Sequence, residues 1–174
     1  IIGTTYSGGS TDDGVLFEFD LDTSTWQMLH SFGSSEGRSP SPSVAISGRK
    51  LYGTTIWGAD NSRGALYEYD LDTQTLAVKA HFTSDSSQAV GVCVGPDGKI
   101  YLQAPIGGSS GHGGVLRYDP TTDDLDLIHS FSSSSANITT GSILHTWEGR
   151  LFGVTRYGGS GAGRGIVYEI NAGS

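Results

Sequence analysis

The sequence predicts an all-β fold built from repeated four-stranded units, and three observations support this fold class. Glycine is abundant, with 27 residues in a chain of 174, and clusters of Ser, Thr and Asp separate short apolar runs. No window keeps apolar residues at the spacing of three and four that marks an amphipathic helix. One pattern also recurs along the chain at intervals of about 50 residues.

The repeat consists of a short strand, a glycine, a second glycine and a second strand that ends in Asp or Asn. The first glycine is Gly8, Gly58, Gly107 and Gly158 in successive copies. The second glycine is Gly14, Gly64, Gly113 and Gly165. The second strand ends at Asp20, Asp70, Asp119 and Asn171. Copies that agree at so many positions predict four blade-like repeats.

The second copy shows the strand content of one repeat. We expect strands at residues 43–47, 51–55, 65–70 and 76–82. Asp70 and Thr73 lie between the last two strands, and such side chains favour tight turns by bonding nearby backbone amides. Apolar residues on both sides of 65–70 predict a sheet that is covered on both faces. Gly53 inside a strand predicts a close backbone approach, which we assign to a neighbouring sheet.

A period of about 50 residues with four strands is typical of a kelch-like β-propeller, with an open solenoid or stacked β-array as the alternative. We expect one domain over residues 1–174, with repeats at 1–41, 42–86, 87–140 and 141–174. The first repeat lacks its first strand and the last lacks its fourth. The chain is therefore expected to be an open piece of a larger propeller, with exposed strand edges that favour self-association.

Charge and composition exclude several classes of function. The net charge of −8 opposes binding to nucleic acid or to anionic lipid, which both require a basic surface. No apolar run approaches the roughly 20 residues that cross a bilayer, so we expect no membrane span. Cys93, the one cysteine, lies in an apolar run and is expected in the core. Nothing in the sequence indicates a cofactor.

Several motifs resemble a known family. They read LHSF at residues 29–32, GRSP at 37–40, GRKLYGTT at 48–55 and GALY at 64–67. In this order and spacing they resemble the GloVer tandem repeat, known from bacterial proteins that join it to one of several surface anchors. The resemblance covers essentially the whole chain and implies an extracellular or cell-surface location, but no activity. The third copy departs from the pattern, with Leu102-Gln103-Ala104 in place of Gly-Thr-Thr.

The histidines do not predict a catalytic or metal site. His30, His81 and His129 occupy one position of the repeat. Since a catalytic base is needed once, we assign them a structural role, with a ring nitrogen bonded to the backbone. His112 breaks the repeat but has no second ligand at a usual spacing, and zinc requires three or four. We therefore assign no catalytic residue and no metal ligand.

The long loops form the candidate ligand-binding face. In the expected strand order, loops 6–13, 56–63, 105–112 and 156–164 lie at one end with segments 33–41 and 132–140. The candidate ligand-binding residues on these loops are Tyr6, Trp57, Asp60, Arg63, His112, Tyr157 and Arg164. Aromatic rings beside polar groups suit a glycan, because rings stack on sugars while polar groups bind hydroxyls. The alternative is that Trp57 and Tyr157 pack against the base of their loops.

These features favour a non-catalytic extracellular module that binds a glycan or a protein. One alternative is a propeller lyase or glycosidase on the same face, with its acid and base among Asp12, Asp13, Asp60 and His112. A second alternative is a purely structural surface repeat.

Overall fold

The computed structural model describes residues 1–132, 136–137, 145–158 and 164–172, and each regular element in them is a β-strand. The strands are β1 (Ile2–Thr5), β2 (Val15–Asp20), β3 (Thr25–Ser31), β4 (Arg38–Ser47), β5 (Lys50–Trp57), β6 (Ala65–Asp70), β7 (Thr75–His81), β8 (Gly91–Val94), β9 (Ile100–Ala104), β10 (Gly114–Asp119), β11 (Asp124–Ser130), β12 (Ala136–Asn137), β13 (His145–Trp147), β14 (Arg150–Val154), β15 (Tyr157–Gly158) and β16 (Val167–Ile170). The described residues contain no helix long and apolar enough to cross a membrane.

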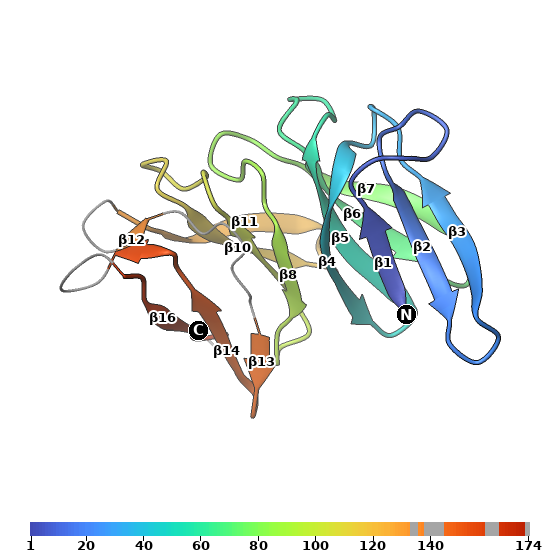
Figure 1. Cartoon of the computed structure of the whole chain (residues 1–174). Helices are drawn as coiled ribbons and strands as arrows, with labels where there is room; N and C mark the ends of the chain where they lie inside the picture. Colours follow the sequence, from blue (N-terminus) through green and yellow to red (C-terminus); the bar gives the residue numbers. More distant parts are fainter. Residues whose placement is uncertain (133–135, 138–144, 159–163, 173–174) are drawn as a thin grey trace.

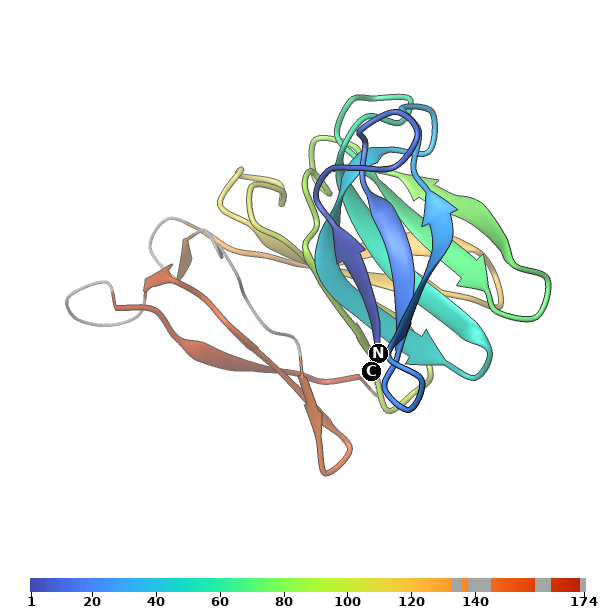
Figure 2. The ribbon, with the colours of Figure 1, turned by 45° about the vertical axis from the view of Figure 1, so that its right-hand side comes forward.

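The strands form antiparallel sheets that follow one another along the chain (Figure 1). Their orders are β1-β2-β3, β4-β5-β6-β7, β8-β9-β10-β11 and β13-β14-β16, and β12 and β15 form a short separate pair. Within the described residues, the first sheet lacks the first strand of the repeat and the fourth sheet lacks the last. The sheets do not close into a ring, and the fourth diverges from the other three (Figure 2). The all-β prediction is therefore confirmed.

Strand bounds in the second sheet follow the expected pattern with one extension. β6 has the predicted bounds, whereas β4 begins at Arg38 and continues its pairing with β5 past the predicted start at residue 43. The pairing shifts between Pro40 and Val44. Proline has no N–H to donate, so prolines inside a sheet favour such an irregularity.

Gly53 makes room for an aromatic ring of its own sheet, so the predicted approach of a neighbouring sheet is wrong. Gly53 pairs with Tyr67 of β6, and a Cβ at residue 53 would lie 2.2 Å from the Tyr67 hydroxyl oxygen. The same arrangement recurs in the first and fourth sheets, as Gly3 with Phe17 and Gly153 with Tyr168. The third sheet replaces both partners together, since Leu102 pairs with Leu116.

Apolar clusters fill the spaces between neighbouring sheets. Between the first and second sheets lie Leu16, Phe32, Leu51, Tyr67 and Tyr69. The cluster between the second and third sheets includes Tyr52, Leu66, Phe82, Ile100, Leu116 and Tyr118. The second sheet is thus covered on both faces, as its sequence predicts. Cys93 is half-buried beside the fourth sheet, where burial raises the pKa of its thiol to about 12.

Candidate functional site

The long loops lie together at one end of the arc, and the short turns lie at the other (Figure 1). Backbone hydrogen bonds tie the loops of neighbouring repeats to one another. The amide of Ser39 donates to the carbonyl of Asp13 at 2.7 Å, and the amide of Ala59 donates to Ser34 at 2.9 Å. These bonds join each loop to the segment that connects two sheets. They hold the loop end of the molecule in a defined shape.

Each repeat closes its loop with the same pair of glycines. The second glycine donates its amide to the carbonyl of the first at 3.0, 3.2, 2.8 and 3.2 Å in Gly14–Gly8, Gly64–Gly58, Gly113–Gly107 and Gly165–Gly158. All four donors have a positive φ, and a Cβ at Gly64 would stand 1.9 Å from the carbonyl oxygen of Thr55. Both conditions require glycine. The spacing found in the sequence therefore marks the closure of these loops.

Threonine and histidine side chains around the loops have structural partners. The hydroxyl of Thr55 accepts the amide of Ala65 at 3.0 Å, which holds the start of β6 beside the end of β5. His30 Nε2 lies 2.9 Å from Glu36 Oε2, and His81 Nε2 lies 3.4 Å from Asp60 Oδ2. Both His30 and His81 thus contact the carboxylate of a loop residue. The expected bond to a backbone group is wrong for these two residues.

The predicted aromatic residues of the face are exposed. Relative exposure is 63% for Tyr6, 40% for Trp57 and 45% for Tyr157. Trp57 and Tyr157 hold the same position, directly before the first loop glycine. The third sheet places Ile106 there, with an exposure of 42%. Our sequence reasoning missed Ile106, although aligning the copies on their glycines identifies it.

The polar candidates differ in their surroundings. Arg63 and Arg164 are exposed and form no ion pair with any described residue. Asp60 is exposed and faces His81, whereas His112 is half-buried. The Arg156 guanidinium lies over the Tyr157 ring, 5.2 Å from its centre. Cationic and aromatic groups are thus available together at this end.

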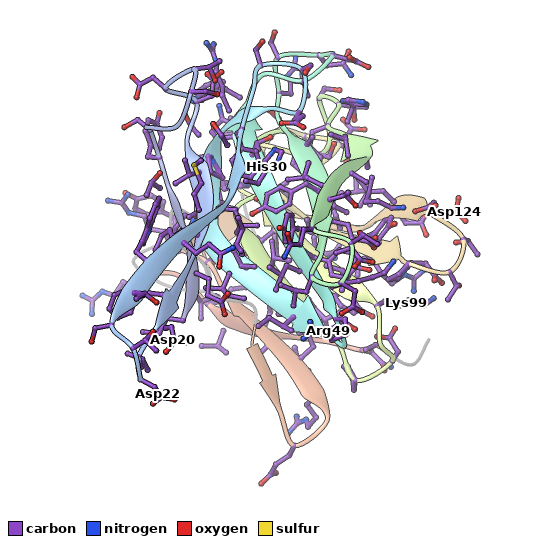
Figure 3. All side chains as sticks on the ribbon, turned by 90° about the vertical axis from the view of Figure 1, so that its right-hand side faces the viewer. Asp20, Asp22, His30, Arg49, Lys99 and Asp124 are labelled. Atoms are coloured by element: carbon purple, nitrogen blue, oxygen red, sulfur yellow. The ribbon has the colours of Figure 1, made fainter. Side chains whose placement is uncertain are left out.

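Some charges at the turn end form ion pairs. Arg49 Nε lies 2.9 Å from Asp72 Oδ1, and Lys99 Nζ lies 3.1 Å from Asp119 Oδ2. Figure 3 shows Arg49 and Lys99 near the turns and His30 near the loops. The hydroxyl and amide of Thr121 bond Asp119 and, with Lys99, hold the pKa of this carboxyl near 2. This end is therefore stabilised by its own side chains.

The candidate residues share one end of the molecule but not one pocket. Trp57 belongs to β5 of the second sheet and Tyr157 to β15 of the fourth repeat, so the third repeat, with Ile106 in the loop after β9, lies between them in the chain. A groove of about 580 Å³ lies elsewhere, between the third and fourth sheets, lined by residues such as Val115, Ile128 and Tyr168. No group of three or more His, Cys, Asp or Glu that could hold a metal occurs in the described residues.

The stacked antiparallel sheets, two of which have four strands, define this chain as a repeat protein of the β-propeller type. The model of the Gloeobacter/Verrucomicrobia repeat matches residues 1–173, and the chain belongs to this family. The resemblance to the GloVer repeat is thereby confirmed. No protein among curated sequences matches the chain.

Solved structures with the same fold include β-propeller proteins. TolB from Acinetobacter baumannii is similar with a TM-score of 0.60 at 19% identity, over 93% of this chain and 39% of that chain. The extracellular domain of BT4673 from B. thetaiotaomicron is similar with a TM-score of 0.54 at 15% identity, over 83% of this chain and 18% of that chain. The chain thus spans less than half the length of either structure, and the likeness concerns the fold alone.

Proposed function

We propose that this chain is a non-catalytic binding module of an extracellular or cell-surface protein, and that its loop end binds a glycan. One observation carries the proposal. Successive repeats expose a large apolar side chain at the same loop position, as Trp57, Ile106 and Tyr157. Large apolar side chains that recur on an exposed surface favour an interaction site over a purely structural role.

The surroundings of these side chains favour a carbohydrate. Aromatic rings stack on the faces of sugars, while Arg63 and Arg164 offer donors to hydroxyl groups and Asp60 offers an acceptor. The positions lie on successive repeats, which suits an extended polysaccharide better than a single sugar. Weak contacts along such a chain reinforce one another through effective concentration.

The proposed location and parent protein follow from the family and the fold. The similar structure from B. thetaiotaomicron is an extracellular domain, which supports an extracellular location for this chain. We also propose that the chain is part of a larger kelch-like propeller, since it spans 39% of the TolB chain to which it is similar.

A glycan array tests the proposal, followed by calorimetric titration of the polysaccharide that binds. Trp57→Ala and Tyr157→Ala should each weaken binding roughly tenfold or more, because each removes a stacking surface. Trp26→Ala is the matched control, since Trp26 is 56% exposed on β3. The Trp26→Ala variant should bind the polysaccharide with the same affinity as the unmodified chain. Absence of glycan binding, or an equal loss in all three variants, would contradict the proposal.

A further inference from the structure

Two arginines lie near Trp57 at the loop end of the second sheet. Arg38 of β4 is the pairing partner of Trp57 in β5, so their side chains lie on the same side of the sheet. Arg63 lies at the far end of the loop that follows Trp57, and the backbone bond from Gly64 to Gly58 closes this loop. Trp57 and Arg63 each directly precede one of these glycines, so the closure brings them together.

Backbone contacts fix the position of this loop against the start of β4. The amide of Ala59 donates to the carbonyl of Ser34 at 2.9 Å. A Cβ at Gly58 would stand 3.1 Å from the Cα of Gly37 and 3.2 Å from the backbone nitrogen of Arg38. The two segments are therefore in close contact. A ligand that binds here meets a preformed backbone, which lowers the entropic cost of binding.

The two arginines differ from other cations of the chain because they lack an ion pair. Arg38 and Arg63 are exposed, and neither pairs with a described carboxylate. Cations of the sheets and turns pair at 2.6 to 3.4 Å, as Arg49 with Asp72, Lys50 with Glu68, Lys79 with Asp123, Lys99 with Asp119, Arg117 with Asp126 and Arg150 with Glu169. The guanidinium groups of Arg38 and Arg63 thus remain available to another partner.

Acidic residues of the neighbouring loops do not neutralise these arginines. Asp60, from the loop between Trp57 and Arg63, contacts His81. Glu36, from the segment before β4, contacts His30. The carbonyl of Asp13 bonds the start of β4, but its carboxylate forms no ion pair with a described residue.

The net charge of −8 does not prevent an anion from binding at this end. Asp20 and Asp22 lie at the turn end, away from His30 at the loop end (Figure 3). β2 has six residues, so its two ends lie about 20 Å apart at a rise of about 3.3 Å per residue. The Debye length is about 8 Å at physiological salt, and exposed charges beyond it are largely screened. Local groups therefore decide which ligand binds at the loop end.

We infer that Trp57, Arg38 and Arg63 form a subsite for an acidic sugar, whose ring stacks on Trp57 and whose carboxylate binds the arginines. The inference rests on the proposed glycan-binding function and names the class of glycan. A guanidinium group donates two parallel N–H···O bonds to a carboxylate, and charge-assisted bonds are roughly twice as strong as neutral ones. Unpaired arginines beside an exposed aromatic ring therefore favour a uronic acid over a neutral sugar.

An array of uronic-acid oligosaccharides, each printed beside its carboxyl-reduced form, tests the inference. The whole chain should bind an acidic member roughly tenfold or more tightly than the reduced form, which carries an alcohol in place of the carboxylate. Raising NaCl from about 0.05 to about 0.5 M should weaken binding of the acidic form alone, because salt screens exposed charges. Equal binding of both forms would overturn the inference and leave the proposed function intact, whereas binding of neither form would contradict both.

Single variants separate the roles of charge and stacking. Arg38→Ala and Arg63→Ala should each weaken binding of the acidic form roughly tenfold and that of the reduced form far less. Trp57→Ala should weaken binding of both forms by the same factor, because stacking does not require the carboxylate. Arg49→Ala is the matched control, since this arginine side chain is 65% exposed at the turn end, and it should bind like the parent.

The substituted residues are exposed, so all four variants should keep the circular dichroism spectrum and melting temperature of the parent. If Arg38→Ala and Arg63→Ala retain the parent's full preference for the acidic form, the assignment of these arginines is wrong.

Discussion

The pairing of Gly53 with Tyr67 predicts how substitutions at these two positions combine, and the third sheet carries leucine at both of them. Replacing both residues by leucine, as in Leu102 and Leu116, should be far better tolerated than replacing either one alone. A leucine at position 53 places its Cβ 2.2 Å from the Tyr67 hydroxyl oxygen and 2.4 Å from the ring carbon that bears it. Tyr67 is fully buried, so its ring has no open space to enter.

The expected energies follow from packing. Overpacking at residue 53 should cost about 3 kcal/mol, near the upper end for inserted carbon atoms in a dense core. Tyr67→Leu leaves a cavity and should cost about 2 kcal/mol. In the double variant the new side chain occupies the space of the lost ring. The two substitutions should therefore couple favourably by about 2 kcal/mol or more.

Chemical denaturation of the four proteins measures this coupling. The matched control is Gly33→Leu, because a Cβ at Gly33 meets no atom within 4 Å and the residue has no positive φ. That variant should be close to the parent in stability. If the losses of the two single variants simply add in the double variant, the proposed reason for glycine in this strand is wrong.

Three further predictions concern single side chains. Tyr67→Phe should raise the free energy of unfolding by about 1 kcal/mol, because the buried hydroxyl has no partner among the described residues; a loss of stability would contradict this. Bonds from the Thr121 hydroxyl and amide, together with Lys99, lower the pKa of Asp119 from 3.8 to about 2, so the ionised carboxylate favours the folded state. That contribution to stability is complete above about pH 4 and is lost as the pH falls towards 2. The Asp119→Asn variant should therefore show a weaker dependence of melting temperature on pH between about 4 and 2. The same dependence in variant and parent would contradict this. His30→Ala should destabilise more than His81→Ala, because the His30 carboxylate contact is shorter (2.9 against 3.4 Å) and its side chain less exposed (23% against 36%); the reverse order in thermal melts would contradict this.

Glycine spacing predicted the loops because the same backbone conformation recurs in every repeat. Gly14 and Gly64 have positive φ values and lie against a threonine carbonyl, and no other residue fits both conditions. The sequence also indicates the Gly–aromatic pairing, because the third copy has Leu102 at the position of Gly53 and Leu116 at the position of Tyr67. Comparing strands within each copy would have found it, whereas a general rule for glycine in strands pointed to the wrong neighbour.

Features that depend on contacts between loops could not be predicted from the repeat. The carboxylate partner of His30 is Glu36, from the segment that joins two sheets, whereas His81 faces Asp60, from a loop within its own sheet. Equivalent histidines thus contact carboxylates from different segments of the chain. The exposure of Trp57 likewise depends on how its loop folds back, so the sequence left both an exposed and a packed position open.

Amide chemical-shift mapping with a glycan selected on the array tests the central claim most directly. We predict that the perturbed amides gather at the loop end, in residues 6–14, 33–38, 56–64 and 105–113. Amides of the opposite turns, in residues 21–24, 71–74 and 120–123, should keep their positions. Perturbations confined to those turns, or the absence of any glycan that binds, would contradict the assignment of the loop end as the binding face.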